Sequence, residues 1–211
     1  MCEFRMKTDL QTHYGDYYEG LCGEWKRLSR ADTVENVTTL CAGVPHRTVL
    51  EIGCGDGVLL ELLAESDDGF GEELYAIEVA QSAVDLTRDR GIRSLRACTV
   101  FDGYTVPYED GRFDLAILSH VIEHVEYPRR LLNEAARVAR HVFVEVPLEH
   151  NARLPEDFAF TRTGHLNFYS RKSVRRLVQS CGYEVVAQVV RNPSGRVYRH
   201  NYGWKGVMNT S

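Results

Sequence analysis

Three glycines, Gly53, Gly55 and Gly57, lie within the stretch TVLEIGCGDGVLLELLAE, between an apolar run and a leucine-rich run. Glycine loses more backbone freedom on folding than any other residue, so its concentration here needs a physical reason. A strand, a glycine turn and a helix together present backbone N–H groups and the positive end of the helix dipole to a ligand. The stretch therefore predicts a site at which a ligand lies directly against the backbone.

Other side chains capable of chemistry follow later apolar runs. Glu78 stands in LYAIEV, Asp102 follows LRACTV, and His120, Glu123 and His124 follow FDLAILS. A carboxylate that closes an apolar strand needs a polar partner, because its burial alone is costly. Histidine can act as a general base near neutral pH. These positions are therefore candidates for binding and for proton transfer.

These residues are positioned by alternating strand and helix patterns. Short, largely apolar and β-branched runs predict strands at 48–53, 74–79, 95–100, 113–119 and 141–147. Helical patterns occupy residues 58–65 and 80–90, a third helix opens at Pro128, and a fourth follows the N-cap Ser170. The alternation predicts an α/β fold with an open, doubly wound sheet, which binds ligands beyond the carboxyl ends of its strands. Residues 183–190 are predicted as a further strand, and residues 192–195 as a turn toward a returning partner.

Composition limits the classes of function. The chain of 211 residues has a net charge of −5 and a pI near 5.9, so it has no overall attraction to nucleic acid or anionic membranes. We expect no membrane insertion, because no segment approaches the length of a membrane span. Six scattered cysteines show no zinc-ligand spacing, so we expect reduced thiols, a cytoplasmic protein and no metal.

The glycine spacing leaves two ligand classes. A dinucleotide site needs G-x-G-x-x-G, and here the third glycine arrives one residue early. The second candidate is S-adenosylmethionine, whose methionine end must lie against bare backbone. Nicotinamide chemistry is therefore disfavoured by the spacing.

Four motifs resemble class I S-adenosylmethionine-dependent methyltransferases. VLEIGCGDG is similar to the first motif of that family, and AIEVA places Glu78 at the end of the second strand. FDGYTVPYEDGRFDLAILSHVIEHVEYP is similar to its D-x-x-x-x-P…F-D…E-H-V-x-x-P block. GHLNFYSRKSVRRLVQSCGYEV is similar to a segment of the small-molecule subgroup (methyltransferase types 11 and 12) that includes quinone-biosynthesis enzymes. The resemblance covers about residues 35–190.

The resemblance implies a Rossmann-like, mostly parallel sheet of seven strands, or slightly fewer, with helices on both faces. It implies S-adenosylmethionine as methyl donor, S-adenosylhomocysteine as product, and an oxygen or nitrogen of a small molecule as acceptor. A cofactor-binding partner or sensor subunit without turnover is the alternative. The oligomeric state stays open.

The resemblance also implies which residues hold the cofactor. Glu51 would lie near the methionine ammonium, Glu78 would accept both ribose hydroxyls, and Asp102 would contact the adenine edge unless it only forms an Asx-turn. Tyr18 belongs to HYGDYYEG, which is either a lid over the sulfonium or plain helix packing. The full expected set is Glu51, Gly53, Cys54, Gly55, Gly57, Glu78, Val79, Asp102, Gly103, Ser119, His120 and Tyr18.

Two histidines are candidates for catalysis. His165 lies in the long connection 148–169, which would cover the acceptor, and could act as a general base or orient the acceptor. His124 is the second candidate, and a purely structural role is the alternative for both. Arg153, Arg162 and Arg171 crowd the same region, so the acceptor could be acidic.

We expect one domain over residues 1–211. Residues 1–35 would form a helical cap or lid, residues 36–190 the Rossmann-like core, and residues 191–211 a tail or final hairpin.

Overall fold

Five strands form one parallel sheet in the order β3-β2-β1-β4-β5. The computed structural model describes residues 23–66, 69–148 and 164–191, with side chains from residue 27 onward. The predicted Rossmann-like fold class is confirmed, with a sheet shorter than seven strands in the described part. The strands are Thr48–Ile52 (β1), Glu73–Glu78 (β2), Leu95–Val100 (β3), Phe113–Ser119 (β4) and Ala139–Glu145 (β5).

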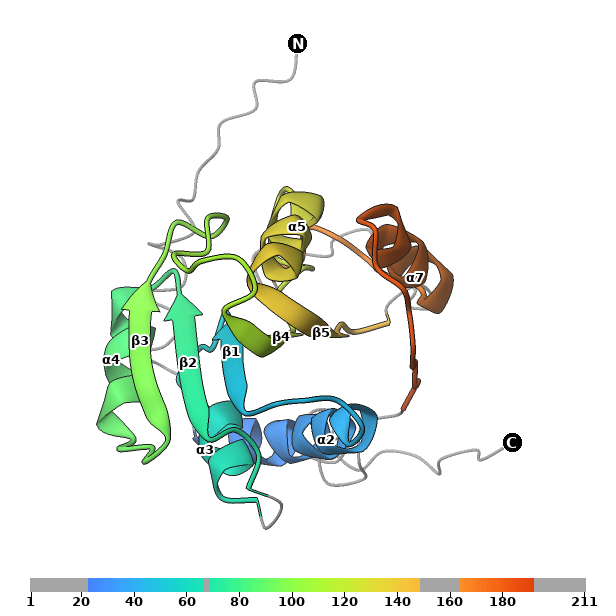
Figure 1. Cartoon of the computed structure of the whole chain (residues 1–211). Coiled ribbons are helices and arrows are strands. Elements are labelled where there is room, and N and C mark those ends of the chain that lie inside the picture. The colour runs from blue at the N-terminus through green and yellow to red at the C-terminus, as the bar shows by residue number, and fades with distance from the viewer. Residues whose placement is uncertain (1–22, 67–68, 149–163, 192–211) are drawn as a thin grey trace, which may run out of the picture.

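Helices cover both faces of the sheet (Figure 1). On one face, α2 and α3 pack together and share a core with Val49 and Ile117. On the other face, α5 and α7 share a core with Leu50 and Leu118. Successive strand residues thus enter opposite cores, which explains why the strands are apolar on both sides. The helices are Gly23–Cys41 (α2), Val58–Ala64 (α3), Gln81–Asp89 (α4), Pro128–Val138 (α5) and Arg171–Ser180 (α7).

The helix ends follow the predicted signals. Pro128 occupies the first turn of α5, and the Ser170 side chain accepts a hydrogen bond from the backbone N–H of Ser173 at the start of α7. The apolar stripe of α5 is fully buried, whereas α7 is partly exposed along its length.

The predicted strand over 183–190 is wrong in the described structure. These residues run as an extended segment that pairs with no strand, and Val186 is 82% exposed. A β-branched sequence favours an extended backbone, but only the hydrogen bonds of a neighbouring strand make it a strand. Among the described residues, β5 is therefore an edge of the sheet.

The helix α2 and the long connection after β5 both lie next to the candidate site. α2 begins within the expected cap and continues past residue 35, where Val37 and Cys41 enter the core. The long connection after β5 has its two ends joined, because Leu148 and Tyr169 form an isolated parallel bridge. Residues 149–163 of this connection lie outside the described residues.

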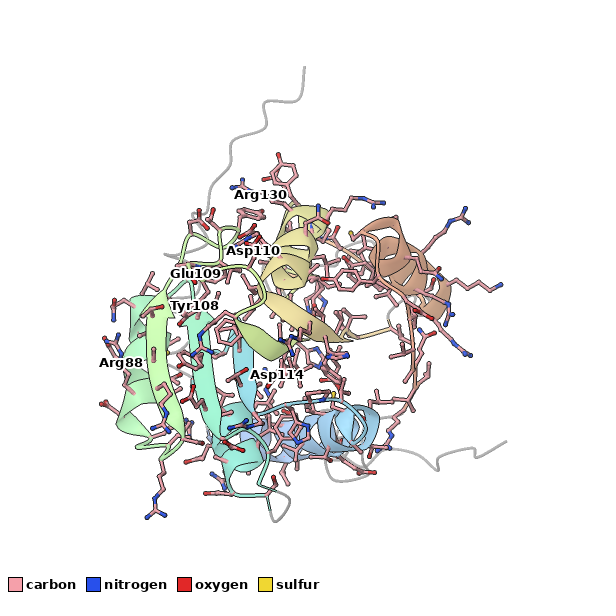
Figure 2. All side chains as sticks on the ribbon, viewed as in Figure 1. Arg88, Tyr108, Glu109, Asp110, Asp114 and Arg130 are labelled. Carbon is pink, nitrogen blue, oxygen red and sulfur yellow. The ribbon has the colours of Figure 1, made fainter. Side chains whose placement is uncertain are left out.

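Polar side chains link the strands to one another and to α4. Asp114, at the start of β4, accepts hydrogen bonds from the backbone N–H and the hydroxyl of Thr48 at the start of β1 (Figure 2). Arg88, labelled on α4 in the same view, donates two hydrogen bonds to the carbonyl of Cys98 on β3. The first contact joins β1 to β4 at their amino ends, and the second ties α4 to β3.

No helix in the described ranges is both long and apolar enough to cross a membrane.

Gly57→Ala tests the turn before α3. Gly57 has φ +77°, and an added Cβ would lie 2.7 Å from Cγ2 of the fully buried Thr87. We expect a loss of about 1–3 kcal/mol in the free energy of unfolding, from left-handed strain and this clash. Urea unfolding measures it. Gly43→Ala is the control, because its Cβ meets nothing within 4 Å and should change stability by less than about 0.5 kcal/mol. Equal effects of the two changes would contradict this account of the turn.

Candidate cofactor and acceptor site

The strand order reverses at β1, which has β2 on one side and β4 on the other. In open sheets of this kind, the helices that leave adjacent strands at such a point go to opposite faces, and ligands bind in the crevice beyond the carboxyl ends. The glycine turn follows β1, Glu78 ends β2, and Ser119 ends β4. The fold thus brings three separate predicted segments to one edge.

The glycine turn is held to β2 by hydrogen bonds. The N–H groups of Gly53 and Cys54 donate to the carbonyl of Ile77, at 2.8 and 3.3 Å. A Cβ on Gly53 would lie 2.7 Å from Cγ2 of Val121, so the turn also packs closely on the segment after β4. The Cys54 side chain points into the core beside Thr87 and Cys98, which leaves its backbone to face the crevice.

Glu78 binds the glycine turn with one oxygen and its own strand end with the other. Oε2 accepts from the Gly55 N–H at 2.9 Å, and Oε1 accepts from the Val79 N–H at 2.7 Å. Burial raises the pKa of Glu78, while the hydrogen bonds from Gly55, Val79 and Ala80 act in the opposite direction. An ionised carboxylate offers about four acceptor positions, so these three backbone donors leave room for a further hydroxyl donor.

Glu51 is a buried carboxylate whose Oε2 has no hydrogen-bond partner among the described residues. Burial raises its pKa to about 8, opposed by the charge of Arg30 and reinforced by Glu78 and Asp56. An orphaned buried acceptor is costly unless a donor reaches it. The oxygen is therefore a position where a cationic ligand group would be stabilised.

Asp102 forms the Asx-turn that was the alternative interpretation. Oδ1 accepts from the N–H groups of Tyr104 and Thr105, and Oδ2 accepts from the Thr105 hydroxyl. The hydrogen bonds from Thr105 and Tyr104 lower the pKa of Asp102 below its ordinary value. Gly103 is buried with φ +87°, and a Cβ there would touch Val79. Contact of this turn with an adenine stays a prediction.

A polar network joins α2 to the ends of β4 and β5. Arg30 donates to the Ser119 hydroxyl at 2.9 Å, and that hydroxyl donates to Oε2 of Glu145 at 2.8 Å. Thr33 and Asn36, also on α2, donate to the same carboxylate. This network holds the Arg30 guanidinium next to Ser119 at the carboxyl end of β4.

The pKa of Glu145 lies below its ordinary value. Burial acts to raise it, but the charge of His120 and the hydrogen bonds from Ser119, Asn36 and Thr33 outweigh that effect. The carboxylate is therefore held ionised beside Arg30.

Sequence reasoning missed Arg30 and Glu145. Arg30 lies in a segment with no recognisable motif, so nothing marked it. Glu145 had a signal, because it is a carboxylate within the apolar strand HVFVEVP, the same reason that marked Glu78.

His120 has a left-handed backbone, with φ +56°, unlike every other non-glycine residue that the structure describes. Its Nδ1 lies 3.2 Å from Oε1 of Glu123, and its Nε2 lies 3.7 Å from Oε2 of Glu145. Such strain persists only where surrounding contacts hold it, and it is common at functional sites. The ring is 41% exposed at the carboxyl end of β4.

The two predicted catalytic histidines lie together. The rings of His124 and His165 are T-shaped, with centroids 4.8 Å apart. Nδ1 of His124 lies 3.1 Å from the carbonyl of Gly164, to which it donates. Burial lowers the pKa of His124, with the charge of Glu123 opposing. A neutral ring at physiological pH follows, and a catalytic role for either histidine stays a prediction.

Several expectations lie outside the described residues. They concern Tyr18, Arg153 and Arg162. Arg171 is described and is exposed at the start of α7.

A family model for a methyltransferase domain matches residues 24–188. The chain belongs to this family. The expected resemblance to class I methyltransferases is thereby confirmed, and the match includes α2 together with every strand of the sheet.

Curated relatives carry names of N- and O-methyltransferases. The ajmaline N-methyltransferase of Rauvolfia serpentina is 31% identical over 108 residues, which cover 49% of this chain and 36% of that enzyme. The ubiquinone biosynthesis O-methyltransferase of Bordetella avium is 25% identical over 113 residues, covering 51% of this chain and 44% of that enzyme. The chain thus spans less than half the length of these two relatives.

Solved structures share the fold. A crystal structure of a SAM-dependent methyltransferase from Aquifex aeolicus superposes with a TM-score of 0.64 at 18% identity, covering 85% of this chain and 93% of that one. The chain described here therefore shares its arrangement of strands and helices with a methyltransferase of similar length.

Glu51→Gln tests the buried acid of the site. In the unfolded chain Glu51 loses its proton near the ordinary pKa of 4.5, whereas the folded protein keeps it to about 8. The folded state therefore holds the extra proton between these values, and the free energy of unfolding should fall as pH rises through that window. Glu51→Gln should weaken this fall when urea unfolding is followed across the window. The exposed Glu109→Gln is the control, and an unchanged pH dependence in Glu51→Gln would contradict the assignment.

Proposed function

We propose that this protein is an S-adenosylmethionine-dependent methyltransferase acting on an oxygen or nitrogen atom of a small-molecule acceptor. The observation that carries the proposal is the buried Glu78 carboxylate, bonded to the N–H of Gly55 within the glycine turn. That contact supports the proposal, because a carboxylate that could accept ribose hydroxyls then lies beside a bare backbone bend. Family membership and the names of its relatives support the same activity.

The residues present fit the cofactor. Glu78 would accept the ribose hydroxyls alongside its backbone donors. The orphaned Oε2 of Glu51 would accept from the methionine ammonium, and the nearby Arg30 would pair with the methionine carboxylate. The carboxylate and the ammonium of the methionine half would thus face the Arg30 guanidinium and the Glu51 carboxyl group, respectively.

When bound, the cofactor supplies an electrophilic methyl group whose thioether leaving group needs no protonation. The chain therefore contributes mainly alignment and exclusion of water, which are worth up to about 7–11 kcal/mol in well-oriented systems. His165 and His124 lie beside the strand ends and would receive or orient the acceptor proton, worth about 10²–10⁴-fold in rate for a hydroxyl nucleophile.

The acceptor is proposed to be a small molecule, as the names of the relatives suggest. An acidic acceptor remains our proposal from the arginines of the long connection. We also propose that the protein acts in the cytoplasm, because Cys54 and Cys98 serve as small apolar core residues.

Glu78→Ala should weaken binding of S-adenosylhomocysteine by more than about tenfold, since a hydrogen bond to a charged group contributes about 1.5–3 kcal/mol. Isothermal titration calorimetry measures the dissociation constant. Glu73→Ala, at the partly exposed start of the same strand, is the matched control and should bind as the unaltered protein does.

Glu78→Gln is a control for a folding defect in Glu78→Ala. The glutamine keeps the shape of the side chain and one carbonyl acceptor. It should fold with a normal circular dichroism spectrum and still lose affinity. Unchanged affinity in both Glu78 variants would remove this residue from the site.

Arg30→Gln tests the position of the amino-acid half. We expect an affinity loss of about tenfold or more for S-adenosylhomocysteine, from the lost charge-assisted pair. Binding of 5′-methylthioadenosine, which has neither the carboxylate nor the ammonium, should be unchanged. Equal losses for the two ligands would show that Arg30 acts elsewhere.

A further inference from the structure

Glu123, His124 and His165 each offer a ligand atom, and these atoms all lie within 4.8 Å of one another. Glu123 is completely buried, yet its Oε2 has no hydrogen-bond partner among the described residues. A buried carboxylate oxygen without a donor is unusual, because its desolvation is uncompensated. A cation at this position would supply the missing partner.

The two histidines are oriented by the backbone around them. Nδ1 of His124 donates to the carbonyl of Gly164, so its Nε2 carries the lone pair, 4.0 Å from Oε1 of Glu123. Histidines that bind metals commonly donate their other ring N–H to a carbonyl in this way, which fixes tautomer and ring orientation. His120 contacts the same Glu123 oxygen from the other side, at 3.2 Å.

Backbone hydrogen bonds hold the two segments together. The N–H groups of Leu166 and Asn167 both donate to the carbonyl of Glu123, at 2.7 and 3.0 Å. The Asn167 amide donates to the carbonyls of Ile122 and Val125. The position of His165 beside Glu123 is therefore fixed by the chain on either side of both residues.

We propose that Glu123, His124 and His165 form a binding site for a divalent transition-metal ion. Two imidazoles and one carboxylate suit Zn²⁺, Mn²⁺, Fe²⁺ or Co²⁺ better than Mg²⁺, which prefers oxygen ligands alone. Three protein ligands leave coordination positions open, as in catalytic rather than structural metal sites. The sequence alone predicted no metal, because His165 is distant along the chain and no regular ligand spacing marks the set.

The position of the proposed metal site relative to Arg30 indicates which part of the acceptor the ion would bind. His120 bridges the ligand cluster to Glu145, and the hydroxyl of Ser119 links Glu145 to Arg30 at the cofactor crevice. An oxygen of the acceptor bound to the ion would thus lie on the cofactor side, and its hydroxyl would ionise more readily. This part rests on the proposed function and points to acceptors with a hydroxyl group.

Cobalt(II) binding to the intact chain tests the site. We expect one ion per chain, with visible d–d absorption typical of nitrogen and oxygen ligands and displacement by Zn²⁺. His165→Gln should weaken binding by at least about tenfold, because even partners of metal ligands contribute 10–100-fold. Glu123→Gln should do the same, and its fold is checked by circular dichroism because the side chain is buried.

His141→Gln is the matched control. His141 lies near the amino end of β5 and contacts the carbonyl of Asp114, so its loss should leave cobalt binding unchanged. Failure to bind cobalt, a spectrum dominated by thiolate charge transfer, or normal affinity in folded His165→Gln would each overturn the proposal.

The measurement separates this inference from the proposed function. Cobalt binding needs neither cofactor nor acceptor, whereas Glu78→Ala should weaken S-adenosylhomocysteine binding by more than about tenfold and leave cobalt binding intact. Either proposal can therefore fail while the other stands.

Discussion

The hydrogen bond from the Gly55 N–H to the Glu78 carboxylate is the contact on which the candidate site depends. It joins the turn after β1 to the end of β2, inside a region from which water is excluded. The carboxylate is costly to bury, and the backbone donors that offset this cost also fix its direction. The glycine turn and the Glu78 side chain thus fix each other's position. A ligand that supplies hydroxyl donors completes a set of hydrogen bonds that the protein alone leaves unfinished.

The second constraint is the meeting of α2 with the ends of β4 and β5. Arg30, Ser119 and Glu145 come from three elements that are far apart in sequence, and their hydrogen bonds bring a cation beside the buried Glu51. Opposite charges in a crevice of low polarity interact more strongly than in water. The arrangement suits a zwitterion, with one end for its carboxylate and the other for its ammonium. α2 therefore contributes polar side chains to the candidate site as well as covering the sheet.

The segment after β4 contains a residue with a strained backbone, His120, and a second histidine, His124. The left-handed backbone of His120 lets one ring touch carboxylates on both sides, Glu123 and Glu145. The same segment receives two backbone hydrogen bonds from the connection after β5, which brings His165 beside His124. An incompletely satisfied carboxylate at the centre of this group is the feature least explained by stability alone. Function is the usual reason that such a feature is retained.

The sequence by itself determined the order of strands and helices, the glycine turn and the acid that ends β2. Those features are local, because apolar periodicity, capping residues and glycine spacing each act within a few residues. For Asp102 it left an Asx-turn in FDGY as the alternative to an adenine contact, and the structure shows that turn. Only the tertiary structure decided that 183–190 pairs with no strand among the described residues, since a strand needs a partner that sequence pattern does not supply. It alone also revealed Arg30 with Glu145, and Glu123 with His165, because hydrogen bonds and clusters between distant segments depend on how the sheet and its connections fold together.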